Sequence, residues 1–166
     1  MNRSTRSIVR AAMIAAIYVV LTVLFQPISF GAIQFRVSEL LTLLPLFMAE
    51  AIPGLFIGCL LSNLLGGAIW FDVVFGAIAT LLAAICTYRL RRCRILAALM
   101  PVLFNGLIVG PVVYFGYVWA PGTEILYGVL WATIASVAAG EALVCLAVGL
   151  PLIGAVGAAD RGLLSR

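Results

Sequence analysis

Six apolar runs, separated by short polar or Gly/Pro-containing stretches, constrain what this chain can fold into. The runs cover residues 11–25, 40–49, 54–70, 72–88, 95–119 and 125–157. An apolar helix needs about 20 residues to cross the hydrocarbon core of a bilayer. Within lipid the backbone must satisfy its hydrogen bonds internally, and a helix does so. The sequence therefore predicts an all-α membrane protein, a six-transmembrane-helix bundle.

The composition excludes several other classes of protein. Hydrophobic residues make up 65% of the 166 residues and charged residues only 10%, whereas a soluble domain has roughly 25% charged residues. Histidine is absent, and the four cysteines show no CxxC spacing, so we expect no metal site, no disulfide framework and no cofactor. No nucleophile-base pair is evident either, so we do not expect an enzyme. The arginines form short clusters beside apolar runs, which is a topology signal and not a nucleic-acid footprint.

The arginine clusters predict the orientation of the bundle. Six spans place both termini on one side, and the positive-inside rule makes that side the cytoplasm. Arg36 is then the only basic residue on the outer face. We expect a cytoplasmic basic leader at residues 1–10, a transmembrane domain at residues 11–157 and a cytoplasmic tail at residues 158–166. The second run is short for a crossing, and Pro101 and Pro111 in the fifth run predict a kinked helix.

The stretch at residues 34–39 contains an arginine and a glutamate and lies between apolar runs in which charged residues are rare. We interpret it as the lip of a solute-binding pocket on the outer face. Glu39, Asp72 and Glu124 lie at the outward-facing starts of the second, fourth and sixth spans, and together they favour a neutral or cationic solute. For Asp72 and Glu124, helix capping is the simpler interpretation.

Three further polar residues lie inside apolar runs. Glu141 is near the centre of the sixth run, where an ionisable group costs at least about 2.5 to 3.5 kcal/mol and is a functional-site hypothesis by default. A structural hydrogen bond to another helix is the competing account. Asn63, with Trp70 on the same predicted helix face, resembles the wall of a pocket for a flat heterocycle, although an interfacial aromatic belt also explains Trp70. For Asn105 we expect a bond that ties two helices together.

Several segments resemble the QueT family, in the same order and over nearly the whole chain. They are Ile33-Gln34-Phe35-Arg36-Val37-Ser38-Glu39, Ala51-Ile52-Pro53-Gly54-Leu55-Phe56-Ile57-Gly58-Cys59, Asn63-Leu64-Leu65-Gly66-Gly67, Phe71-Asp72-Val73-Val74-Phe75-Gly76 and Gly140-Glu141. QueT proteins are substrate-binding S components of energy-coupling factor (ECF) transporters, thought to import precursors of queuosine.

The resemblance implies six helices in the bacterial plasma membrane and a solute site near the outer surface. It also implies that partner subunits supply the energy for transport. Those partners are a membrane-embedded T protein and two ATP-binding subunits, and the absence of a Walker A pattern in this chain fits that division. In S components a small-residue motif on the first helix docks the T protein. The pairs Ala11/Ala15 and Ala12/Ala16 resemble that motif, although packing within the bundle would also use small residues.

A 7-deazaguanine ligand would suit these residues chemically. It presents two adjacent donors, which one carboxylate can accept together, and an O6 atom that needs a donor. We assign Glu39 or Glu141 as the acceptor for the edge of the ring that carries the two donors. The donor to O6 would be Asn63, Gln34 or Arg36. Stacking falls to Trp70 or Phe35, and Asp72 would pair with an aminomethyl group. An S component for another vitamin and a stand-alone proton-coupled carrier remain as alternatives.

Overall fold

The computed structural model describes residues 3–26 and 36–155, and every regular element in those residues is helical. The elements are α1 (Arg3–Leu24), the 3-10 helix η1 (Val37–Leu46), α3 (Ala51–Leu65), α4 (Trp70–Arg89), α5 (Arg94–Phe104), the π-helical η2 (Asn105–Val109), α6 (Gly110–Val113), the π-helical η3 (Tyr114–Val118), α7 (Tyr127–Ala142) and the π-helical η4 (Leu143–Gly149). The all-helical prediction is confirmed.

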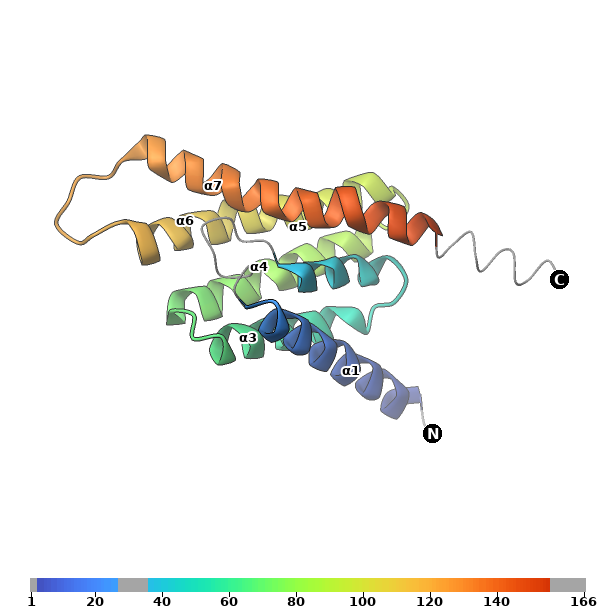
Figure 1. The fold of residues 1–166 in the computed structure, drawn as a ribbon. Coiled ribbons are helices and arrows are strands. Elements are labelled where there is room, and N and C mark those ends of the chain that lie inside the picture. The colour runs from blue at the N-terminus through green and yellow to red at the C-terminus, as the bar shows by residue number, and fades with distance from the viewer. Residues whose placement is uncertain (1–2, 27–35, 156–166) are drawn as a thin grey trace.

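The elements form six passes that alternate in direction. Figure 1 shows the start of α1, the turn between α4 and α5, and the end of the α7–η4 pass at one end of the bundle. The turn between α3 and α4 and the loop before α7 lie at the other end. Four helical stretches in the described residues are long and apolar enough to cross a membrane, namely Ser4–Leu24, Trp70–Arg89, Arg94–Val118 and Tyr127–Ala155. The passes at Val37–Leu46 and Ala51–Leu65 are shorter apolar helices.

Helix boundaries differ from the predicted runs in several places. The third run was expected to reach Trp70, but α3 ends at Leu65 because Gly67 adopts a positive φ of 72°, a conformation that suits glycine and terminates the helix. Trp70 therefore begins α4 and does not share a helix with Asn63, so the pocket wall predicted from their common face is wrong. Helix α1 begins at Arg3, inside the predicted leader.

The capping prediction holds for Asp72 only as a charge in the first turn of a helix, and it is wrong for Glu124. Asp72 lies in the first turn of α4, whose N-cap is Ile69, and it makes no side-chain capping bond. Helix α7 begins at Tyr127, so Glu124 precedes the helix and cannot cap it.

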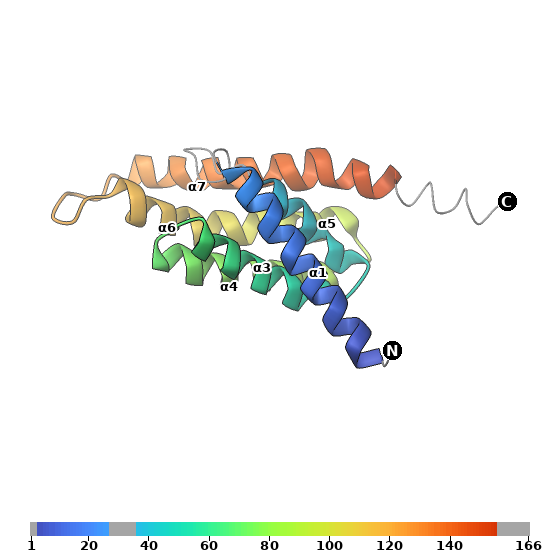
Figure 2. The ribbon, with the colours of Figure 1, turned by 60° about the horizontal axis from the view of Figure 1, so that its bottom comes forward.

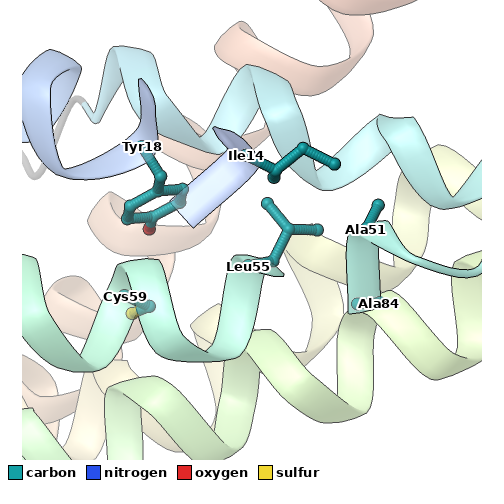
Figure 3. Close-up of a cluster of buried hydrophobic side chains, with 6 residues drawn as sticks. All are labelled: Ile14, Tyr18, Ala51, Leu55, Cys59 and Ala84. Carbon is teal, nitrogen blue, oxygen red and sulfur yellow. The ribbon is translucent and has the colours of Figure 1, made fainter. Parts of the chain in front are cut away.

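Helix α1 packs closely against α3 through small residues, and Figure 2 shows α1 crossing α3 obliquely. A Cβ atom on Gly54 would lie 2.6 Å from the backbone oxygen of Ala11, and one on Gly58 would lie 2.8 Å from Tyr18 Cβ. Small residues at such a contact let two backbones approach closely inside a membrane bundle. The buried side chains at this contact form a cluster with α4, shown in Figure 3: Ile14, Tyr18, Ala51, Leu55, Cys59 and Ala84.

Candidate functional site

A small polar cavity lies where η1, η2 and α7 meet. Its lining consists of Arg36, Glu39, Asn105, Val109, Val137 and Glu141. The space available to the centre of a water molecule is about 10 Å³, which is room for roughly one water. Residues distant in sequence, from the second, fifth and sixth passes, therefore share one enclosed site.

Arg36 is the charged partner of Asp72. Arg36 directly precedes η1, Asp72 lies in the first turn of α4, and Arg36 Nη2 is 3.6 Å from Asp72 Oδ2. Burial alone would lower the pKa of the Arg36 guanidinium, but nearby acidic groups, Asp72 foremost, raise it above its ordinary value, so Arg36 stays positively charged. Together with Glu39 and Glu141, the site holds one cation and three carboxyl groups.

Glu39 is held from several directions. The Tyr18 hydroxyl of α1 donates a hydrogen bond to Glu39 Oε1. The backbone oxygen of Glu39 accepts a hydrogen bond from the Thr42 hydroxyl, which lies one turn further along η1, and one from the Cys145 thiol at 3.8 Å. Glu39 is only 1% exposed. Its carboxyl group therefore sits in a fixed, desolvated position.

Glu141 projects from α7 into the same cavity. The Cys145 thiol, one turn further along, lies 3.5 Å from Glu141 Oε1 and shares its one hydrogen between that oxygen and the Glu39 backbone oxygen, and Cys145 Sγ also lies 3.6 Å from the Thr42 hydroxyl. Glu141 and Cys145 share a face as the helical spacing predicts. The thiol therefore lies between the two glutamates and contacts both of their residues.

Asn63 lies outside the cavity lining and supports the site through the backbone of Asp72. Its side chain is fully buried on α3, and its Nδ2 donates to the backbone oxygen of Asp72 at 3.1 Å. This bond ties α3 to the start of α4 and so places the Asp72 carboxyl opposite Arg36. Asn63 does not line the cavity that the structure describes.

Several buried polar atoms have no hydrogen-bond partner in the described residues: Glu39 Oε2, Asn63 Oδ1, both carboxyl oxygens of Asp72 and Asn105 Nδ2. Such atoms are rare in native proteins, and each calls for a water, an ion or a ligand to satisfy it. Glu39 and Asn105 belong to the same cavity lining, and the Asn105 amide also lies within reach of the Glu141 carboxyl. The lining therefore presents both acceptors and donors to the cavity.

Apart from Asn63, the predicted site residues divide into three groups by position. The structure brings Arg36, Glu39 and Glu141 together at the cavity, with Asp72 against Arg36. Trp70 is 64% exposed and lies against Phe71, with ring centroids 3.9 Å apart, away from the cavity lining. Gln34 and Phe35 lie outside the described residues.

Two residues of the site were not assigned to it from the sequence. The sequence predicts a helix-tying role for Asn105, but the structure places it in the cavity lining, where α5 gives way to the π-helical η2. Tyr18 carries little signal in the sequence. Its only sequence signal is a hydroxyl-bearing ring in the middle of an otherwise apolar run.

The predicted docking alanines all line one surface groove, but they differ in exposure. Ala11 and Ala15 lie against Gly54 and Gly58 of α3. Ala12 and Ala16 are exposed and line an apolar surface groove of about 710 Å³. Much of the remaining groove wall comes from α3, through Pro53, Ile57 and Leu61. Ala11 and Ala15 therefore pack on α3 at the edge of the groove, and Ala12 and Ala16 are its more accessible pair.

An all-helical bundle with four candidate membrane spans and a cluster of buried ionisable side chains at one small cavity is typical of membrane transport proteins. The family model described as QueT transporter matches residues 8–158, and the chain belongs to this QueT transporter family. A curated relative, the queuosine precursor transporter QueT of Lactococcus lactis subsp. cremoris (strain MG1363), is 44% identical over 79 residues. That alignment covers 46% of each protein, so the chain matches about half the length of this relative. No solved structure matches the chain.

Proposed function

We propose that the protein is the substrate-capture S component of an ECF-type importer in the bacterial plasma membrane, and that it binds a queuosine precursor of the 7-deazaguanine type. The observation that carries the solute-binding role is the meeting of Glu39, Glu141, Arg36 and Asn105 at one buried cavity. The name of the Lactococcus relative supports the choice of solute. The protein would have no enzymatic activity of its own.

The chemistry of a 7-deazaguanine fits the unsatisfied groups of the site. Its N1-H and exocyclic amine would donate to Glu39 or Glu141, since one carboxylate can accept two adjacent donors. Its O6 would accept from Asn105, with Arg36 as a second donor. Gln34 keeps its predicted O6 role and Phe35 its stacking role as proposals. Asn63 and Trp70 do not line the cavity, so they would take their predicted roles only after the site rearranges. Asp72 would receive an aminomethyl group only by sharing its contact with Arg36.

The size of the cavity adds a requirement. Small-molecule pockets typically measure about 300 to 1,000 Å³, whereas this cavity has room for about one water. A heterocycle would therefore enter only after the surrounding side chains or passes move apart. We infer that the described arrangement is a closed form and that solute binding opens it.

The experiment that tests the proposed function is solute binding to the purified protein. We expect wild-type protein to bind 7-aminomethyl-7-deazaguanine, and Glu39→Gln and Glu141→Gln each to weaken binding by about tenfold, because the amide replaces a carboxyl oxygen that accepts from the solute with an NH2 group that cannot, at a cost of about 1 to 3 kcal/mol. Isothermal titration in detergent measures this, and native mass spectrometry checks for a co-purified heterocycle. Glu124→Gln is the matched control, because Glu124 is exposed in the loop before α7.

Two results would redirect the proposal. Unchanged affinity in both glutamate variants would remove the cavity as the binding site. Binding of an unrelated vitamin in place of deazaguanines would favour an S component of another specificity. A stand-alone proton-coupled carrier is the second candidate, favoured by the buried carboxyl of Glu141, and it would import solute without partner subunits.

Docking to the T protein is part of the same proposal. The exposed alanines Ala12 and Ala16 and the apolar groove beside them supply a surface where another helix could approach closely. The T protein and two ATP-binding subunits would then supply the drive. Ala11 and Ala15 would take part through the same groove while remaining packed on α3.

A further inference from the structure

Tyr18 connects α1 to the solute site. It is fully buried, although it comes from a helix whose other faces are widely exposed. Figure 3 shows its ring pointing from α1 toward α3. Its hydroxyl donates a hydrogen bond to Glu39 Oε1. The first pass therefore reaches the cavity through one side chain, without lining it.

The Glu39 carboxyl needs an external group to fix its orientation. The terminal torsion of a glutamate is broad and has no strong intrinsic preference. In the described residues Oε1 accepts from Tyr18, while Oε2 accepts no hydrogen bond. The Tyr18 bond thus distinguishes the two oxygens and leaves one of them available.

Tyr18 is itself held in place. A Cβ on Gly58 would lie 2.8 Å from Tyr18 Cβ and 3.1 Å from Tyr18 Cγ, so the ring base rests directly on the α3 backbone. The Thr22 hydroxyl donates to the backbone oxygen of Tyr18 at 2.9 Å and pairs with the Ser38 hydroxyl, whose Oγ lies 2.7 Å away. Thr22 and Ser38 therefore form a second bond between α1 and η1, which does not touch the Glu39 carboxyl.

We propose that Tyr18 is a positioning residue for solute binding, whose hydroxyl fixes the Glu39 carboxyl so that Oε2 is presented to the donor edge of the bound heterocycle. The inference rests on the proposed function for the identity of that heterocycle. Groups whose supporting contacts lock them in place bind with less loss of conformational freedom than groups that must be ordered on binding. Tyr18 would act only through Glu39 and would make no contact with the solute.

The test compares Tyr18→Phe with Thr22→Val. Both variants remove one buried hydroxyl of α1 that bonds η1, but only the first removes a donor to the carboxyl. With 7-aminomethyl-7-deazaguanine as the probe, we expect Tyr18→Phe to weaken binding about tenfold, because the Glu39 carboxyl must then be ordered when the solute binds. Thr22→Val should change affinity by less than about twofold while lowering thermal stability as much as Tyr18→Phe does.

A double-mutant cycle separates positioning from general packing. In a Glu39→Gln background, Tyr18→Phe should have little further effect on affinity, because the two residues act as a unit. Equal losses of affinity in Tyr18→Phe and Thr22→Val would overturn the inference. Additive losses of affinity from Tyr18→Phe and Glu39→Gln would do the same, and either result would leave the proposed function standing. Absence of probe binding by the wild-type protein would instead overturn the proposed function.

An infrared measurement tests the same contact without any solute. The Glu39 carboxyl band is identified as the one lost in Glu39→Gln, and its position depends on its hydrogen bonds. We expect Tyr18→Phe to shift this band and Thr22→Val to leave it in place. A band that does not move in Tyr18→Phe would overturn the positioning role even if no solute were available.

Discussion

At the scale of single residues, Arg36 and Asp72 form a buried ion pair in which each charge depends on the other for its stability. Their side chains are only 6% and 0% exposed, and their nearest charged atoms lie 3.6 Å apart. Removing one partner of a buried pair leaves an uncompensated charge, which costs much more than the pair contributes. We therefore expect Asp72→Asn to destabilise the protein by about 3 kcal/mol, measured as thermal unfolding in detergent.

The exposed pair of Arg10 and Glu50 is the matched control for that prediction. Arg10 Nη1 lies 3.4 Å from Glu50 Oε1, with side chains 58% and 26% exposed. Pairs of this kind contribute about 0 to 1 kcal/mol, so Glu50→Gln should barely change the unfolding temperature. Similar losses in both variants would contradict the view that burial makes the Arg36–Asp72 pair important.

Residue by residue, the sequence indicated part of the site. Arg36, Glu39 and Glu141 stand out because charge is scarce in apolar runs, and the structure places them at one cavity. Asn105 and Tyr18 do not stand out, because a neutral polar side chain in a span ties helices together as often as it lines a cavity. Only the packing of distant passes decides between these roles, and no spacing within one run contains that information.

At the scale of elements, apolar runs predicted where helices lie better than they predicted helix type. The run at 40–49 was expected to be a membrane helix, and the structure has a 3-10 helix at Val37–Leu46 with Pro45 inside it. A 3-10 helix rises about 2.0 Å per residue, so its 10 residues extend further than an α-helix of equal length would. The interruptions expected in the fifth run take the form of two π-helical segments, η2 and η3.

Helix α1 supports a prediction that concerns one whole element. Its buried face bonds η1 through Tyr18 and Thr22, while Ala12 and Ala16 on another face line the apolar groove. If that groove receives the T protein, Ala12→Trp and Ala16→Trp should each abolish ATP-dependent uptake with the energising subunits co-expressed, because a large ring prevents close helix approach. Solute binding by the purified variants should stay within about twofold of wild type, a change of less than about 0.5 kcal/mol.

Ile17→Trp is the control for this prediction. Ile17 is exposed on α1 but does not line the groove, so the added ring should leave uptake unchanged. Uptake that survives in the alanine variants would remove the groove as the docking surface. Proton-driven uptake by the wild-type protein in vesicles without the other subunits would favour the stand-alone carrier.

At the scale of the whole molecule, the alternating passes separate two ends of unlike charge. The end that holds the start of α1 and the α4–α5 turn also holds Arg89, Arg91, Arg92 and Arg94. The opposite end holds the loop before α7, with Glu124. Between the two ends, many large apolar side chains are exposed on the bundle surface, as expected where lipid is the solvent. The positive-inside rule then predicts a cytoplasmic arginine end.

Cys93 offers a direct test of this orientation, because it is exposed within the arginine turn while Cys59 and Cys145 are buried. A membrane-impermeant maleimide should label Cys93 in permeabilised cells but not in intact cells, and Cys93→Ser should abolish that labelling. In the Cys93→Ser background, Thr123→Cys should be labelled in intact cells, because the 25-residue candidate span Arg94–Val118 separates the two positions. Labelling of both positions from one side would mean that this stretch does not cross the membrane, and the reverse pattern would mean that the bundle is inserted the other way round.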